Sequence, residues 1–224
     1  MKANLLVLAA LAALCALPAS AGARIIEVGG ASATVQPSCP ASPCEVVSRT
    51  TAFQLRVGAK RKLFVAPRDG RIVAWTITLG KPKKVQTEFF EENLGGAAQA
   101  GITVMKTGDR SYARVLARSP LQPLTPYFGQ TVQFPLATTL PVEKGNLVAL
   151  TVPTWAPTLA LGLGKGNVWK ASRDRDSCDD TQTQSAQTDI NDLQQYKCKY
   201  RTARLAYSAT LITTPEPPEE AGKD

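Results

Sequence analysis

Gly70-Arg-Ile-Val-Ala-Trp-Thr-Ile-Thr-Leu79 alternates its apolar side chains with a period of two residues. This period is that of a β-strand, in which successive side chains point to opposite faces. The side chains expected on one face are all apolar: Val73, Trp75, Ile77 and Leu79. Because such a face must be buried, Trp75 is predicted to be a core residue rather than a platform for a ligand.

Strand periodicity recurs on both sides of this stretch, for example at residues 53–57, 102–105 and 112–117 and in a final strand at 199–212. The run 147–152 is apolar on both faces, which indicates a central strand. Residues 88–100 break the alternation and are expected to form a long loop with at most one helical turn. About nine or ten strands and no amphipathic helix predict an all-β chain, an antiparallel β-sandwich of jelly-roll type, with a closed barrel as the nearest alternative.

Four segments carry a resemblance to a known group of domains. They are Gly70-Arg-Ile-Val-Ala-Trp-Thr-Ile-Thr, Ile102-Thr-Val-Met-Lys, Tyr112-Ala-Arg-Val and Leu140-Pro-Val-Glu-Lys-Gly-Asn-Leu-Val-Ala-Leu. In this order, and over about residues 45–152, the chain resembles the small secreted jelly-roll domains common in bacteria. Some similar folds bind carbohydrate. The resemblance implies a strand-and-turn architecture and transfers no catalytic residue.

The N-terminus has the three-part plan of a cleavable signal peptide. Lys2 supplies the positive charge, an apolar run extends from Leu5 to Leu17, and small residues follow it, with cleavage after Ala21 or Ala23 fitting equally well. We therefore expect a secreted protein, extracellular or associated with the cell envelope and not inserted in a membrane. The expected division is a signal peptide at 1–23, a single β-sandwich domain at 24–213 and a disordered acidic, Pro-rich tail at 214–224.

Cysteine and histidine usage excludes several kinds of chemistry. Four cysteines remain after removal of the signal, and an even number in an exported chain predicts two disulfides. The pairs Cys39 with Cys44 and Cys178 with Cys198 are favoured because each is close in sequence, while a pairing of the N-terminal segment with the last strand stays open. The chain has no histidine, which removes Ser-His-Asp and Cys-His catalysis and the usual histidine metal ligands. No cofactor and no metal site are expected.

Positive charge is concentrated in one part of the sequence. The formal charge of +8 falls to +7 once Lys2 leaves with the signal, and residues 49–84 hold ten basic residues against the single acid Asp69. This sector predicts contact with an anionic surface or polymer, although solvated strand edges are the simpler interpretation. Nucleic acid is not the expected partner, because no nucleic-acid motif accompanies the charge. The candidate contacts are Lys60, Arg61, Lys62, Lys81, Lys83 and Lys84.

Two tryptophans are candidates for a carbohydrate surface. Trp155 lies between two prolines at the end of a strand, and Trp169 follows a Gly-rich turn. Flat indole faces stack on sugar rings, and the neighbouring Asn167 and Lys170 could bond hydroxyl groups. The interpretation that the sequence favours is that both indoles close the ends of the core, because large aromatic side chains are usually mostly buried.

Together these features predict a secreted, non-catalytic binding or structural module that recognises carbohydrate or an anionic polymer. The alternative is a glycan hydrolase or lyase that uses loop carboxylates, with Glu88, Glu91 and Glu92 as the available acids. A structural calcium ion also stays open, because Asp174, Asp176, Asp179 and Asp180 are close in sequence and carboxylate oxygens in a loop can hold Ca²⁺.

Overall fold

The computed structural model describes residues 22–30, 35–179 and 184–215, and these are mostly β-strand in antiparallel sheets. The predicted signal peptide and acidic tail lie almost entirely outside the described residues. Fifteen strands are present in the described part, four of them with only two residues, against the nine or ten expected. No helix among the described residues is long and apolar enough to cross a membrane.

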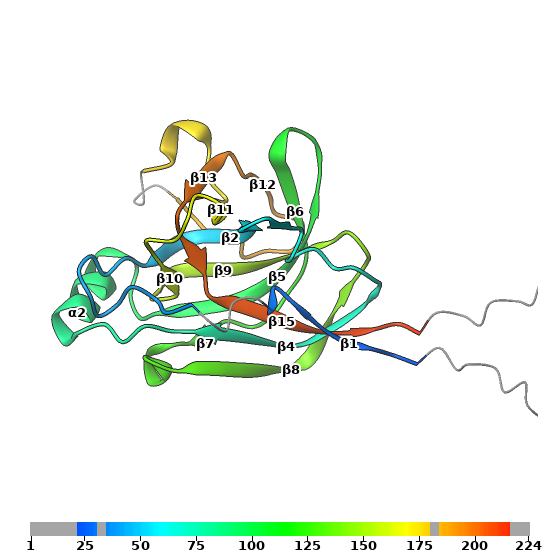
Figure 1. The fold of residues 1–224 in the computed structure, drawn as a ribbon, viewed down its shortest axis with the longest axis horizontal. Coiled ribbons are helices and arrows are strands. Elements are labelled where there is room, and N and C mark those ends of the chain that lie inside the picture. Colours follow the sequence, from blue (N-terminus) through cyan, green and yellow to red (C-terminus); the bar gives the residue numbers. More distant parts are fainter. Residues whose placement is uncertain (1–21, 31–34, 180–183, 216–224) are drawn as a thin grey trace, which may run out of the picture.

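One sheet has four strands in the order β1-β15-β4-β8 (Figure 1). These strands are β1 (Ile25–Val28), β15 (Tyr207–Thr213), β4 (Gly70–Thr78) and β8 (Thr131–Val142). The stretch that begins at Gly70 is therefore an inner strand, and the burial of Trp75, at 0 % exposed, confirms its place in the core. A β-bulge at Val73 interrupts the register with both neighbours, so Ile72 is buried and Val73 only half-buried.

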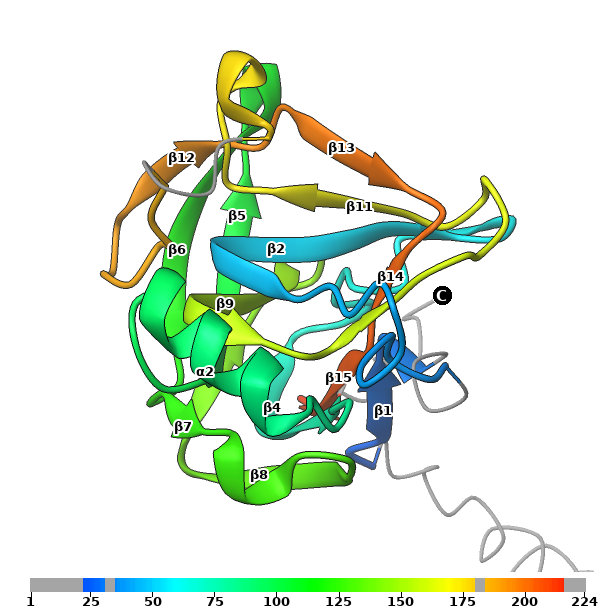
Figure 2. The same ribbon diagram turned by 90° about the vertical axis from the view of Figure 1, so that its left-hand side faces the viewer.

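The larger sheet has nine strands and curls strongly across the molecule (Figure 2). Its main path is β12 (Leu193–Gln195), β6 (Tyr112–Arg118), β5 (Gln99–Thr107), β9 (Leu147–Ala156), β2 (Val47–Val57), β11 (Val168–Ala171) and β13 (Cys198–Arg201). The short strands β3 (Lys60–Arg61) and β7 (Gln122–Pro123) pair with β2 and β5, and β10 (Leu159–Ala160) pairs with β14 (Arg204–Leu205). The central position predicted for residues 147–152 is confirmed, because all six are buried in β9 between β5 and β2.

The prediction of a loop at residues 88–100 is wrong for the first half of this segment, which belongs to the helix α2 (Lys84–Asn93). The backbone N–H of Lys83 donates to Oε1 of Gln86 at 2.7 Å and closes the first turn. Phe90 is buried against Trp155, with ring centroids 5.0 Å apart, whereas Phe89 is 60 % exposed. Because the helix buries so narrow a face, its sequence lacks the broad apolar stripe by which surface helices are recognised.

The last expected strand, 199–212, is divided between sheets. Its first part is β13 in the nine-stranded sheet, and its last part is β15 in the four-stranded sheet. Thr202 has φ 62°, a left-handed conformation that ends β13, and its N–H donates to the carbonyl oxygen of Asn167 at 2.9 Å. The turn leaves β13 at the edge of its sheet.

Candidate functional site

The two tryptophans proposed for carbohydrate stacking are both buried. Trp155 is 0 % exposed, packs on Phe90 and Phe128, and donates its indole N–H to the carbonyl oxygen of Gly96 at 3.0 Å. Trp169 is 5 % exposed and stacks on Tyr200, with ring centroids 4.2 Å apart. Neither indole offers a face to a sugar, so the stacking interpretation is corrected: both side chains close the core.

The two polar neighbours of Trp169 have different positions. Asn167 closes its own turn, since its side-chain amide and its backbone N–H both donate to the carbonyl oxygen of Gly164, at 3.1 and 2.9 Å. Lys170 lines an open hollow of about 490 Å³. Of the four residues predicted to bind ligand, the two tryptophans are buried, Asn167 is bonded within its own turn, and Lys170 lines this hollow.

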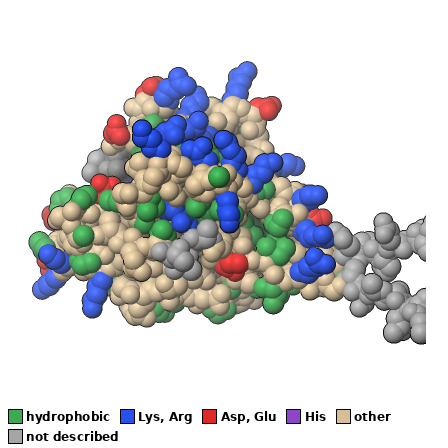
Figure 3. All heavy atoms as spheres, in the orientation of Figure 1, with side chains coloured by type: hydrophobic (Ala, Val, Ile, Leu, Met, Phe, Trp, Pro, Cys, Tyr) green, Lys and Arg blue, Asp and Glu red, His purple; other side chains and the backbone are tan. Residues whose placement is uncertain are grey.

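We call this feature the basic hollow. It is lined by Arg110, Ser111, Tyr112, Lys170, Arg175, Gln195, Lys197 and Lys199. Five of these eight side chains are cations and none is an acid. Three separate regions of the chain supply them: the β5–β6 hairpin, β11 with the following η4 (Arg175–Ser177), and the β12–β13 segment. Among the described residues, none of the five cations forms an ion pair. Figure 3 shows lysine and arginine side chains gathered over this upper part of the molecule.

Two lysines of the basic hollow are directly opposed. Lys170 of β11 and Lys199 of β13 are cross-strand partners, and like charges in this arrangement are destabilising. Burial lowers the pKa of Lys170, and repulsion from Lys199 lowers it further. The pair is thus held together by the sheet against its own repulsion, and a bound anion would relieve that repulsion.

The hairpin side of the hollow has an unusual backbone. Arg110 and Ser111 belong to the short η2 turn (Asp109–Ser111) and have φ values of 52° and 67°. Left-handed conformations are costly for such residues and persist only where the surroundings hold them. Here the carbonyl oxygen of Ser111 accepts the backbone N–H of Tyr196 at 2.9 Å. The hydroxyl oxygen of Ser111 lies 3.4 Å from Nζ of Lys170. These contacts tie the hairpin to the β11–β13 side.

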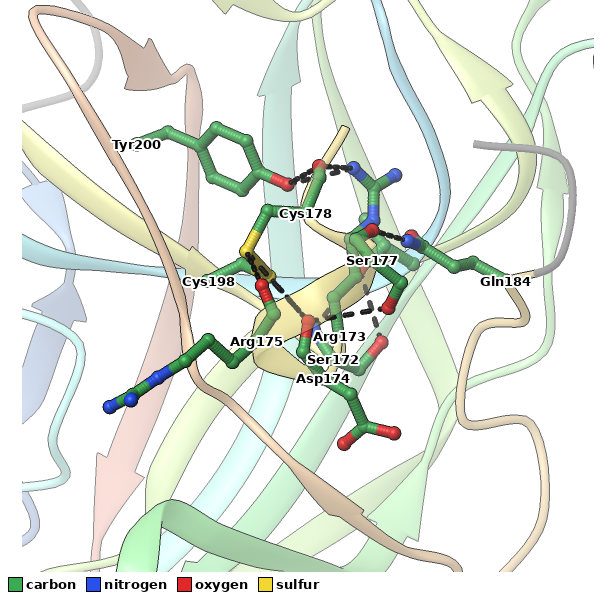
Figure 4. The surroundings of a disulfide bond; sticks show 10 residues. Ser172, Arg173, Asp174, Arg175, Ser177, Cys178, Gln184, Cys198 and Tyr200 are labelled. Atoms are coloured by element: carbon green, nitrogen blue, oxygen red, sulfur yellow. Dashed lines mark hydrogen bonds between the residues drawn. A yellow bond between two sulfur atoms is a disulfide. The ribbon is translucent and has the colours of Figure 1, made fainter. Parts of the chain in front are cut away.

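A disulfide supports the opposite side of the hollow. Both expected pairs are confirmed, Cys39 with Cys44 and Cys178 with Cys198. The second joins the η4 segment, which carries Arg175, to the first residue of β13 (Figure 4). The buried guanidinium of Arg173 donates to the hydroxyl of Tyr200 at 2.9 Å and to the carbonyl oxygen of Cys178 at 3.3 Å. Figure 4 shows Arg175 extending away from this bonded network.

The predicted basic sector does not form a single face. Lys60, Arg61 and Lys62 are exposed at the turn beyond β2, whereas Lys81, Lys83 and Lys84 are exposed before and at the start of α2. Figure 2 shows α2 and the tip beyond β2 on opposite sides of the molecule. Proximity in sequence is lost because β4 and the chain around it cross to the other sheet between the two clusters.

The carboxylates considered for catalysis or for calcium binding do not come together at one site within the described part of the chain. Glu88 lies on the exposed face of α2, where it pairs with Lys84 at 3.7 Å. None of the three α2 glutamates lines a hollow found in the described part of the chain. Of the four aspartates, Asp180 lies outside the described residues, and within them no group of three or more Asp, Glu, Cys or His side chains comes together.

A second, smaller hollow of about 250 Å³ lies on the four-stranded sheet and includes Glu27, Gln133 and Ser208. Its carboxylate is already bonded, because Glu27 accepts the hydroxyl of Ser208 and that of Thr210, the latter at 2.9 Å. The basic hollow, whose five cations form no ion pair within the described part of the chain, is the stronger candidate.

Most of the basic hollow was missed from the sequence. The signal that could have revealed it is Lys197-Cys-Lys-Tyr-Arg201, in which cations alternate with residues that turn inward. Comparisons with known protein families, curated proteins and solved structures find no match for this chain.

Proposed function

We propose that this protein is a non-catalytic binding module of the extracellular space or cell envelope that holds an acidic polysaccharide in the basic hollow. The observation that carries the proposal is the cross-strand pair Lys170 and Lys199 within a group of five cations that form no ion pair with any residue the structure describes. A like-charge cluster of this kind raises the local concentration of anions and is stabilised when it binds one.

The remaining lining groups favour an acidic sugar over a small inorganic anion. Tyr112 is 37 % exposed and supplies an aromatic face on which a sugar ring can stack. Gln195, its cross-strand partner, and Ser111 supply hydrogen-bonding groups for hydroxyls. The hollow therefore combines charge, stacking and neutral hydrogen bonding in one place.

The proposal includes the architecture and the location of the protein. Two antiparallel sheets around an apolar core favour a β-sandwich of jelly-roll type, an architecture on which the edge and loops can carry a binding site. Two disulfides favour an oxidising compartment, in agreement with export by the N-terminal signal.

Retention on immobilised polygalacturonate and dextran sulfate, with neutral dextran as the control matrix, tests the function. The hollow variant Lys170→Gln/Lys199→Gln should elute at much lower salt than the wild type. The matched variant Lys81→Gln/Lys83→Gln removes the same charge beside α2 and should elute unchanged. Equal elution of both variants, or tighter retention on single-stranded DNA than on either acidic polysaccharide, would contradict the proposal.

A further inference from the structure

We infer that the polysaccharide lies lengthwise along β13, so that one chain contacts both the basic hollow and the β2–β3 hairpin. This inference rests on the proposed function and adds to it: the ligand is an extended polyanion with regularly repeated charges. The cations that run from the hollow to the hairpin form what we call the basic track, made of Lys197, Lys199, Arg201, Arg56 and Arg61.

The first half of the basic track follows the strand β13. Lys197, Lys199 and Arg201 are exposed, while the residues between them turn inward. Alternate residues of a strand lie about 6.7 Å apart on one face, so these three charges span roughly 13 Å. Such a row fits a polymer that carries an anionic group at regular intervals.

The second half of the basic track crosses β11. The buried Val168 is the cross-strand partner of both Arg201 on β13 and Arg56 on β2. Partners of this kind point to the same face, so the two arginines flank Val168 at a separation of about 10 Å, two strand spacings. The row therefore continues across the sheet after it leaves the edge.

At the far end a second like-charge pair repeats the arrangement of the hollow. Arg56 is the cross-strand partner of Arg61, so these two side chains share a face, whereas Lys60 is the partner of Val57 and belongs to the other face. The Arg56 guanidinium donates to the carbonyl oxygens of Gly166 and Lys165, both at 3.1 Å. A Cβ on Gly166 would come within 2.9 Å of Gly58, so the two turns pack backbone to backbone. The hairpin cations are thus fixed relative to β11.

The position of β13 offers a simpler explanation for part of the row, because edge strands commonly carry lysine to prevent strand pairing. That explanation covers Lys197 and Lys199. It does not cover Arg56, which lies on β2, two strands inward from the edge. Arg56 also holds the hairpin through its hydrogen bonds, and its position carries the row of charge inward from the edge.

Chain-length dependence tests the inference. Binding of oligogalacturonates from disaccharide to dodecasaccharide would be measured by calorimetry over a range of salt concentrations. The track variant Arg61→Gln/Arg201→Gln removes two charges outside the hollow, and Lys81→Gln/Lys83→Gln is the matched control. Arg56 is left intact because its hydrogen bonds hold the hairpin.

For the wild type and the matched control, affinity should rise steeply with chain length. For the track variant, dodecasaccharide affinity should fall and its salt slope should decrease by about two, roughly one for each charge removed, while disaccharide affinity stays unchanged. A track variant that binds the dodecasaccharide like the wild type would overturn the inference and leave the proposed function standing. Failure of every oligomer to bind the wild type would overturn both. Unchanged circular dichroism and melting temperature show that the variants are folded.

Discussion

At the scale of single residues, Lys170 connects the structure of the hollow to its pH dependence. Its pKa lies below the ordinary value of 10.5, because burial and Lys199 both disfavour the ammonium form. The unfolded chain therefore binds more protons between the lowered pKa and 10.5, and stability should rise with pH in that window. Anion binding needs the charged form and should weaken as pH rises through the same lowered pKa.

The expected result is that wild-type affinity for dextran sulfate declines between neutral and alkaline pH. Lys170→Arg should flatten this decline, because a guanidinium stays charged throughout the range. Sulfate esters keep their charge over these pH values, so the ligand contributes no titration of its own. Identical pH profiles for the wild type and Lys170→Arg would show that Lys170 does not govern binding.

Trp155 is a second single residue with a testable role, because its side chain lies in the core. Its truncation in Trp155→Ala removes the contacts with Phe90 and Phe128 and the hydrogen bond to Gly96, and should cost about 3–5 kcal/mol of unfolding free energy. Phe89→Ala, an aromatic truncation on the exposed side of α2, should change stability by only about 0.5 kcal/mol. Urea denaturation measures both, and a cost below about 1 kcal/mol for Trp155→Ala would contradict the assignment.

The tryptophans also show how far sequence prediction reaches for a single residue. Trp75 could be placed in the core because its neighbours repeat with the period of a strand. For Trp155 and Trp169 the core was favoured but sugar stacking stayed open, because the partners that bury them, Phe90 and Tyr200, come from distant parts of the chain. A strand end flanked by proline looks the same in sequence whether or not a helix covers it.

At the scale of elements, the disulfide between Cys178 and Cys198 should matter for binding as well as for stability. It closes a segment with a sequence separation of 20, for which loop closure contributes about 3 kcal/mol on the chain-entropy model. Cys178→Ser/Cys198→Ser should therefore lower stability by about this amount. It should also weaken polyanion binding, because η4 and Arg175 lose their attachment to β13.

The other disulfide is the matched control. Cys39→Ser/Cys44→Ser removes a bridge with a separation of 5 that carries none of the lining residues, and should leave polyanion affinity unchanged. Affinity measured at a temperature where both variants remain folded separates positioning from stability. Equal loss of affinity in the two variants would argue against a role for η4 in the site.

Element boundaries mark the physical limit of prediction from this sequence. Strand periodicity located β4, β5, β6 and β9, since each has a strongly apolar face. It could not show that the final strand breaks at Thr202 and divides among three sheets, because periodicity does not show where a strand changes its partners. This division places Lys199 and Arg201 at a sheet edge, and the candidate site depends on it.

At the scale of the whole molecule, charge is organised by topology rather than by sequence proximity. Residues 49–84 were predicted to form one basic sector, yet its two lysine-rich clusters lie on opposite sides of the molecule. The basic hollow instead combines residues from three regions between Arg110 and Lys199. Cross-strand register, short turns and a disulfide bring these charges together, and composition reveals none of them.

This arrangement predicts a conflict between stability and binding. Removing the repulsion in Lys170→Gln should stabilise the free protein by a few tenths of a kcal/mol, the magnitude typical of exposed cross-strand pairs. The same variant should be stabilised less by ligand. At a dextran sulfate concentration one hundred times the dissociation constant, the wild type should gain about 2.7 kcal/mol, a rise in melting temperature of roughly 5–10 °C.

Calorimetric melting of the wild type and Lys170→Gln, each with and without dextran sulfate, measures both effects. At about 1 M salt the Debye length falls to about 3 Å, so the ligand-dependent rise should largely disappear while the difference between the free proteins shrinks. A variant that is less stable than the wild type without ligand would mean that Lys170 is a structural residue. In that case the cross-strand pair would no longer be evidence for an anion, and the functional assignment would lose the observation on which it stands.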